Sequence, residues 1–363
     1  MSDFLIVGGG VIGMMTALQL SDAGASVALV ERGECGREAS WAGGGIVSPL
    51  YPWRYSRPIS ALSRWSEGRY PELAGRLHEE TGIDPEYRQK GLLYLRVDDV
   101  EPALNWAREM AKPLERIAAE ALYAREPSAA PGFDSALWMP TLGSIRNPRL
   151  GQALRQRLRQ MSQVTLHEGV TVTGFARTGR VIHGVQTLTG ELHAGQTLVC
   201  TGAWSRELLD TVDVALPIRP VRGQMILFRA PPGLVERVVL KDGRYVIPRA
   251  DGRVLAGSTL EEVGFDKQTT AAARASLYAS ALSIVPALAD CPVEHHWAGL
   301  RPGSPDGVPA IGAVPGFEGL HVNAGHFRNG LVLAPAATRL LVDQLIGCEP
   351  IVDPRPYWLS APS

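Results

Sequence analysis

The chain has 363 residues, which is enough for two domains or for one large discontinuous domain. Apolar residues make up 45% of it and charged residues 20%, a balance typical of soluble globular proteins. The formal net charge is −1, so the composition argues against electrostatic capture of nucleic acid or of an acidic membrane.

The first predicted unit is a strand, a helix and a second strand. An apolar strand is expected over residues 4–7, a helix over about 11–23 and the next strand over 26–30. Glycines spaced G-x-G-x-x-G join the first strand to the helix. This order is the βαβ fingerprint of dinucleotide-binding proteins, whereas a glycine-rich turn that binds nothing is the weaker alternative.

Each glycine of the fingerprint has a physical task. Gly8 permits the tight turn, Gly10 lets a pyrophosphate approach the backbone, and Gly13 lets the helix pack close to the sheet. The N-terminus of the helix offers free N–H groups and a positive dipole end to the phosphates. Glu31 can accept hydrogen bonds from ribose hydroxyls, which disfavours a cofactor with a 2′-phosphate.

The segment after the fingerprint combines small residues, aromatic residues and a helix. Small residues dominate 40–47, and 51–57 is an irregular aromatic loop. That loop could be a lid over a pocket, although packing on the nucleotide-binding domain explains it equally well. One helix is expected over 60–81, ending near Gly82.

From residue 86 to 217 strands and helices alternate. Helices are expected over 99–121 and 148–161. Strands are expected over 92–95, 136–139, 164–167, 170–172 and 196–200, with a hairpin over 182–192. The last strand runs into a turn of small residues at 201–204.

The remainder is rich in strands and ends in a long helix. Alternating runs with tight turns predict an antiparallel sheet with strands over 225–228, 238–240, 245–247 and 254–256. A helix is expected over 268–285 and a long one over 330–346. A short strand at 321–323 and the loop 324–329 precede the last helix.

These elements predict a mixed α/β (α+β) fold with two domains. A Rossmann-like nucleotide-binding domain is expected from three segments, 1–85, 146–217 and 295–363. A mainly antiparallel substrate domain is expected from the two insertions, 86–145 and 218–294.

The fingerprint and its acid suit either NAD or FAD, and three features favour FAD. The chain breaks into loops and antiparallel sheet, whereas nicotinamide enzymes commonly continue through regular βαβ units. The run Gly43-Gly44-Gly45 could let a flat ring lie against the backbone. The C-terminal loop and helix provide a second helix N-terminus that can face a ligand. An NAD-linked dehydrogenase is the alternative.

Over nearly its whole length the chain resembles the glycine oxidase and D-amino-acid oxidase family of FAD enzymes. The less specific motifs that carry the resemblance are the fingerprint, Glu31-Arg32, Ala39-Ser40-x-Ala42-Gly43-Gly44 and Thr201-Gly202-Ala203-Trp204-Ser205. The most specific ones are Arg244-Tyr245-Val246-Ile247-Pro248-Arg249, Trp297-Ala298-Gly299-Leu300-Arg301-Pro302 and Gly325-His326-Phe327-Arg328-Asn329-Gly330-Leu331.

The resemblance implies non-covalent FAD and oxidative deamination of glycine, sarcosine or a small D-amino acid. The products would be the 2-oxo acid, ammonia or an amine, and hydrogen peroxide formed from oxygen. It also implies a homotetramer. It leaves open the preferred substrate and whether the product feeds thiazole synthesis for thiamine or amino-acid catabolism.

The resemblance also implies roles for individual residues. Arg301 and Arg328 would hold the substrate carboxylate, and Tyr245 would assist them. Gly45 departs from relatives that carry a bulkier apolar residue beside the flavin, which leaves the shape of the pocket open. The expected FAD contacts are Gly8, Gly10, Val11, Ile12, Gly13, Glu31, Arg32, Ala39, Ser40, Gly43, Gly44, Gly45, Val172, Thr201, Gly202, Trp204, Arg301, His326, Phe327, Arg328, Asn329, Gly330 and Leu331.

The residue types fit this chemistry. The guanidinium of Arg301 is a planar fork that matches a carboxylate, although a surface salt bridge is the alternative. Tyr245 is expected to turn its hydroxyl to the substrate, although most strand tyrosines are packing residues. We expect no obligatory acid or base, because a hydride can pass from the substrate Cα to flavin N5 when the amine is neutral. The helix that starts after Asn329 would then stabilise the reduced, anionic flavin.

Other kinds of site have little support. Adjacent His295 and His296 point to opposite faces of a strand, so no metal is expected. The four cysteines form no CxxC pair, and no signal peptide or membrane span is recognised, so we expect a cytoplasmic protein. Two alternatives remain: a dehydrogenase that passes electrons to a carrier, and a flavin-binding redox module without turnover.

Overall fold

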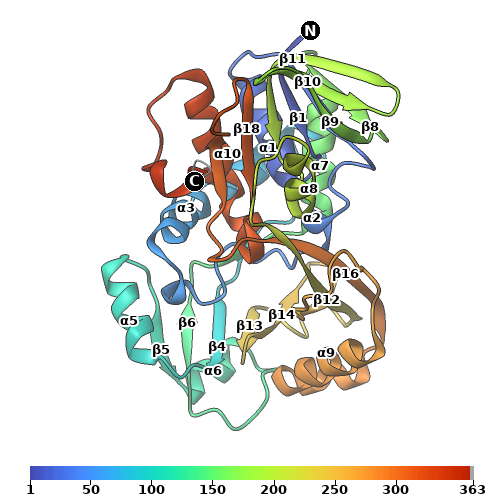
Figure 1. The fold of residues 1–363 in the computed structure, drawn as a ribbon. Helices are drawn as coiled ribbons and strands as arrows, with labels where there is room; N and C mark the ends of the chain where they lie inside the picture. Colours follow the sequence, from blue (N-terminus) through green and yellow to red (C-terminus); the bar gives the residue numbers. More distant parts are fainter. Residues whose placement is uncertain (360–363) are drawn as a thin grey trace.

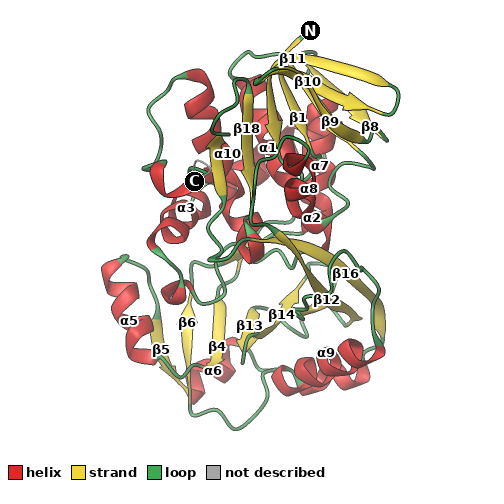
Figure 2. Ribbon diagram, viewed as in Figure 1, coloured by secondary structure: helices red, strands yellow, loops and turns green. Residues whose placement is uncertain are grey.

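The structure is a computed structural model, and it describes residues 1–359. Two large sheets lie at opposite ends of the molecule, each with its own helices (Figure 1; Figure 2). This confirms the predicted mixed α/β fold class. No helix within residues 1–359 is long and apolar enough to cross a membrane. The final four residues of the predicted segment 295–363 lie outside the described part.

The first sheet has a parallel centre in the order β18-β11-β1-β2-β8. β17 pairs antiparallel with β18, and the hairpin of β9 and β10 joins antiparallel through β11. Apolar runs form the central strands, as expected for a parallel sheet that is covered on both faces. The bounds are β1 (Ser2–Val7), β2 (Val27–Glu31), β8 (Val164–Glu168), β9 (Val172–Thr178), β10 (Val181–Thr187), β11 (Gly190–Val199), β17 (Ala310–Ala313) and β18 (Leu320–Ala324).

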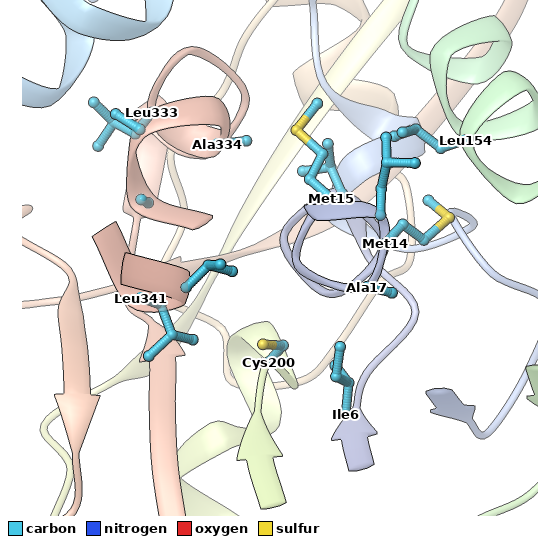
Figure 3. Packing of buried hydrophobic residues seen from close by; sticks show 14 of the residues in the cluster. Ile6, Met14, Met15, Ala17, Leu154, Cys200, Leu333, Ala334 and Leu341 are labelled. Carbon is cyan, nitrogen blue, oxygen red and sulfur yellow. The ribbon is translucent and has the colours of Figure 1, made fainter. Parts of the chain in front are cut away.

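Three helices form the main layer against the first sheet: α1 (Val11–Asp22), α7 (Asn147–Gln160) and α10 (Gly330–Ile346). Figure 3 shows this interior, where Met14 of α1 and Leu154 of α7 belong to one buried cluster. Most apolar residues of these helices are buried, so burial rather than helix propensity stabilises the layer. This packing fixes the start of α1 next to the C-terminal end of β1.

The second sheet has the order β16-β12-β15-β14-β13-β4-β6-β5 and is antiparallel except between β13 and β4. Helix α9 (Ala271–Ile284) packs against β12, β14 and β15, as Figure 1 shows. The strands are β4 (Leu92–Arg96), β5 (Glu115–Ala118), β6 (Ser135–Met139), β12 (Arg219–Arg229), β13 (Val238–Lys241), β14 (Arg244–Pro248), β15 (Arg253–Gly257) and β16 (Val293–Gly303).

Short elements complete the described chain. β3 and β7 pair as a separate two-stranded sheet. In the sequence β3 precedes β4, and β7 follows β6. The short elements are β3 (Arg88–Gln89), β7 (Gly143–Ser144), α2 (Ala39–Ala42), α8 (Ser205–Asp210), and the 3₁₀ turns η1 (Pro52–Arg54), η2 (Gly202–Trp204), η3 (Pro286–Asp290), η4 (Phe327–Asn329) and η5 (Arg355–Tyr357).

For two helices the predicted length was wrong, because each predicted helix is interrupted in the structure. The helix predicted over 60–81 is two helices, α3 (Arg57–Glu67) and α4 (Tyr70–Thr81). The break falls before Pro71, which lacks an N–H and clashes inside a helix but is tolerated in the first turn of a new one.

The helix predicted over 99–121 is also interrupted. α5 (Val100–Glu109) ends early, and α6 (Ala119–Arg125) starts only after strand β5. Pro113 ends the helical pattern, and β5 pairs with β6 at the sheet edge, so tertiary pairing overrides the local apolar spacing.

The two sheets support the proposed division into two domains, with one boundary moved. β16 pairs with β12 along its length, so residues 295–303 lie in the second sheet rather than in the first. We therefore propose that the last segment of the nucleotide-binding domain starts after Gly303. The three other segment boundaries that we expected from the sequence remain proposals.

Glu168 makes the first domain sensitive to acid. Its carboxylate accepts hydrogen bonds from the Cys35 backbone N–H (2.7 Å) and from Arg155 and Arg159 (2.7 and 2.9 Å). Burial favours the neutral form, but these hydrogen bonds and charges outweigh it and lower the pKa of Glu168 to about 2. A lowered pKa stabilises the fold above the unfolded value of 4.5, and this contribution is lost as the pH falls towards 2.

We therefore expect Glu168→Gln to lose on the order of 1–3 kcal/mol of stability at pH 7. Thermal unfolding measured at intervals of about one pH unit, from about pH 7 to about pH 3, would check this. The stabilities of variant and parent should converge as the pH falls. A constant difference between them over that range would contradict the assignment.

Candidate active site

One cavity of about 510 Å³ collects the predicted site residues. It runs from the β1–α1 turn at the edge of the first sheet to β14, β16 and the turn η4 before α10. Every residue that we predicted to bind cofactor or substrate lines this cavity, except Gly13. A Cβ atom on Gly13 would lie 1.9 Å from the Gly8 carbonyl oxygen, so this glycine acts in packing α1 onto the turn.

The fingerprint end of the cavity has the features of a dinucleotide cradle. Gly8 has φ +108° and no space for a side chain, because a Cβ atom would lie 2.5 Å from the Cys200 carbonyl oxygen. The backbone N–H of Val11, in the first turn of α1, donates to the Ser40 hydroxyl (2.8 Å). The carboxylate of Glu31 accepts hydrogen bonds from the N–H groups of Gly9 (2.8 Å) and Gly33 (3.0 Å). It is therefore held in one orientation beside the cavity.

An aromatic and charged cluster closes the same end. The guanidinium of Arg32 lies 3.8 Å from the ring centre of Trp204, which in turn stacks on Phe265 with 5.5 Å between ring centres. Glu38 bridges Arg32 and Lys267, each at 3.1 Å. Phe265 and Lys267 lie in the segment between β15 and α9, so this cluster links that segment to the fingerprint end of the cavity.

The glycine run beside α2 gives the cavity a flat wall. A Cβ atom on Gly43 would lie 2.7 Å from Asn147 Nδ2, and one on Gly45 would lie 1.9 Å from the Ile145 carbonyl oxygen. Gly45 also has φ +86°. Only backbone can therefore form this wall. The wall and the cradle together fit a dinucleotide that ends in a planar ring, as FAD does.

Arg301 provides the positive charge at the other end of the cavity. Its Nη2 donates to the Ser258 hydroxyl (2.8 Å), and its Nη1 donates to the Thr259 carbonyl oxygen (3.1 Å). Both partners are neutral, and burial lowers the pKa of Arg301 below its ordinary value. A guanidinium carries five donors, so this arrangement leaves donors for a carboxylate ligand. Arg301 lies near the end of β16, two residues before its last residue, Gly303.

Tyr245 and Arg328 flank Arg301 in different ways. The Tyr245 hydroxyl is buried beside the glycine wall, 3.3 Å from where a Cβ atom of Gly44 would be. Arg328 lies in η4 and is exposed, so it stands at the mouth of the cavity. Burial lowers the pKa of His326 to about 3, so this imidazole is neutral and cannot serve as a cationic acid near pH 7.

The loop 51–57 is fixed to residues that adjoin strands of the second sheet. Tyr51 accepts a hydrogen bond from the Gly243 N–H (2.9 Å), and Trp53 donates to Asp99 (2.8 Å). Arg54 forms an ion pair with the same carboxylate at 2.6 Å. These contacts favour the packing interpretation of the loop over a lid.

Sequence reasoning missed several lining residues. Ser258 follows β15 and orients Arg301, and Asn147 starts α7 and donates to the Ser40 carbonyl oxygen (2.8 Å). Neither belongs to a recognisable motif, although an Asn-Pro pair that starts a helix was a usable signal for Asn147. The other missed lining residues include Glu38, Ile46, Ser48, Leu50, Leu300 and Asn323. Within residues 1–359 no three His, Cys, Asp or Glu side chains gather as a metal site.

Comparison with known proteins gives consistent results. The family model "DAO: FAD dependent oxidoreductase" matches residues 3–344. A glycine oxidase of Pseudomonas aeruginosa is 53% identical over 353 residues, which are 97% of each chain. The bifunctional protein ThiO/ThiG of Synechocystis sp. is 32% identical over 95% of this chain and 52% of its own. The crystal structure of glycine oxidase from Geobacillus kaustophilus superposes with a TM-score of 0.93 at 30% identity, covering 99% of this chain and 98% of that one.

Proposed function

The chain belongs to the FAD-dependent oxidoreductase (DAO) family, and on this premise we propose that it deaminates glycine, and also sarcosine and small D-amino acids, with oxygen as electron acceptor. The protein is an FAD-dependent enzyme that oxidises amino acids. One observation carries the proposal: the partly buried guanidinium of Arg301, which has no carboxylate partner within residues 1–359, lies in the cavity that also contains the dinucleotide cradle.

The residues of the cavity divide the work. The turn from Gly8 to Gly10 and the start of α1 would hold the pyrophosphate, and Glu31 would hold the ribose. Arg301 would bind the substrate carboxylate from inside the cavity, and Arg328 would do so from its mouth. When bound, FAD would supply the redox chemistry, namely acceptance of a hydride from the substrate Cα and transfer of the electrons to oxygen.

The protein contributes position and electrostatics rather than an acid or base. Burial lowers the pKa of His326 to about 3, so its imidazole is a weak base at pH 7, and we assign the removal of a proton to no residue of the cavity. The substrate amine would therefore bind in its neutral form. Helix α10 starts with Gly330 at the cavity, so its N–H groups and dipole favour negative charge on the ligand there.

A substrate panel with peroxide detection tests the proposal. In air, purified protein should produce hydrogen peroxide with glycine, sarcosine and D-alanine, in an amount that matches the oxygen consumed. Glycine and D-alanine should release ammonia, and sarcosine should release methylamine. Turnover that needs an artificial dye and yields no peroxide would instead identify a dehydrogenase. Absence of reaction with every substrate would favour a flavin-binding redox module.

We propose three further properties of the protein: its location, its oligomeric state and the use of its product. A cytoplasmic location is supported by the free cysteines Cys35, Cys200, Cys291 and Cys348. A homotetramer is expected from the family resemblance, and light scattering would measure it. Supply of an oxidised product to thiazole synthesis for thiamine is supported by similarity to the ThiO/ThiG protein.

A further inference from the structure

Arg249 is a buried arginine that has no role in the proposed site so far. It follows β14 directly, and only 7% of the residue is exposed. Its Nη1 donates to the Ile145 carbonyl oxygen (3.0 Å), and its Nη2 donates to the Gly44 carbonyl oxygen (2.8 Å). No carboxylate of the described chain pairs with it directly, because the nearby Glu86 and Asp251 both pair with Arg146 (3.0 and 2.9 Å).

The two carbonyl groups belong to segments that already pair with each other. The N–H of Ile145 donates to the Gly45 carbonyl oxygen (2.8 Å), and Ile46 forms an isolated bridge with Ser144. The backbones are so close that Gly45 cannot carry a side chain. A planar guanidinium that spans both segments fixes their relative orientation more rigidly than a single donor would.

The contact with Gly44 determines how the cavity wall is oriented. In a trans peptide the C=O and the following N–H point in opposite directions. Because the Gly44 carbonyl points to Arg249, the N–H of Gly45 points away from Arg249. Gly44 and Gly45 both line the cavity beside Tyr245.

We propose that Arg249 is a positioning residue, which turns the Gly44–Gly45 peptide so that the Gly45 N–H faces the cavity as a hydrogen-bond donor to the flavin. This inference rests on the proposed function only in taking FAD as the ligand. The buried positive charge also polarises the peptide, which strengthens the donor on its far side. A donor at this wall stabilises negative charge on the reduced cofactor.

The reduction potential of the bound flavin tests this proposal without requiring glycine oxidation. It can be measured by equilibration with a reference dye and a chemical reductant. Arg249→Met keeps an unbranched side chain as far as the position of Nε but removes the guanidinium with its charge and both hydrogen bonds. Arg249→Lys keeps the charge but offers a point donor instead of a fork. Arg253→Met is the matched control, since Arg253 lies in the same sheet and pairs with Asp251 and Glu294.

Arg249→Met should weaken the preference for the reduced flavin roughly tenfold, which lowers the potential by about 30 mV for a two-electron couple. It should lower kcat for glycine more than it raises KM. Arg249→Lys should restore only part of the potential, and Arg253→Met should leave it unchanged.

A wild-type potential and kcat in an Arg249→Met protein that retains FAD would overturn the proposal. If that variant fails to fold, unchanged values in Arg249→Lys would overturn it equally. A wild-type protein that binds FAD but does not oxidise glycine would refute the proposed function and still leave the potential as a valid test.

Discussion

Replacing Gly10 with valine is expected to abolish FAD retention while the protein stays folded. Gly10 precedes α1 with φ −72°, a conformation that valine adopts without strain. A Cβ atom there would meet only the Ser40 hydroxyl, at 3.2 Å, so the protein itself can adapt. The branched side chain would, however, occupy the space through which a pyrophosphate reaches the N-terminus of the helix. Purified Gly10→Val should be colourless, with thermal unfolding close to that of wild-type protein from which FAD has been removed.

Gly75→Val is the matched control for this experiment. Gly75 is exposed in α4, and a Cβ atom there would have no neighbour within 4 Å. This variant should retain FAD fully. A yellow Gly10→Val protein with stoichiometric FAD would contradict the placement of the pyrophosphate at this turn.

The second large effect is expected from Arg301→Ala. A charge-assisted hydrogen bond is worth roughly 1.5–3 kcal/mol, so the apparent KM for glycine should rise roughly 10- to 150-fold. Loss of the guanidinium also frees Ser258 and Thr259, which it holds by hydrogen bonds at 2.8 and 3.1 Å. Steady-state kinetics together with a titration of an unreactive carboxylate such as acetate would separate binding from turnover.

Two further variants sharpen that experiment. Arg219 lies in β12, the strand that pairs with β16, and its exposed guanidinium forms an ion pair with Glu262 at 2.8 Å. Arg219→Ala removes this guanidinium and should leave KM unchanged. Gly223→Ala should weaken glycine binding while keeping Arg301, because its Cβ atom would lie 2.2 Å from Arg301 Nη1. Unchanged glycine kinetics in Arg301→Ala would remove this residue from the carboxylate site.

Local patterns were sufficient to predict most of the first domain. The apolar strand, the glycine spacing and the following acid depend on neighbours in the sequence, and the structure has β1, α1 and β2 where they were expected. The hairpin predicted over 182–192 is likewise confirmed as β10 and β11. Local turn chemistry and apolar period are strong signals in such units.

Other features depend on contacts between distant segments. The edge strand β5 exists because β6 lies beside it, whereas its sequence also suits a helix. Ser258 and Arg249 have their roles because of distant partners. Ser258 binds Arg301, which lies 43 residues away along the chain, and Arg249 binds Gly44, which lies 205 residues away. No spacing rule within one segment predicts such pairs. Motif reasoning therefore identified the residues that face ligands better than the residues that orient them.

Anaerobic mixing of the purified yellow protein with glycine tests the central claim most directly, namely that this chain binds an amino-acid carboxylate beside its flavin. Methylamine is the control, because it has a primary amine and C–H bonds on the adjoining carbon but no carboxylate for Arg301 to hold. The account predicts that glycine removes the visible absorbance of the oxidised flavin and that methylamine at the same concentration does not. Flavin that stays oxidised with glycine, or that is reduced equally fast by methylamine, would contradict it.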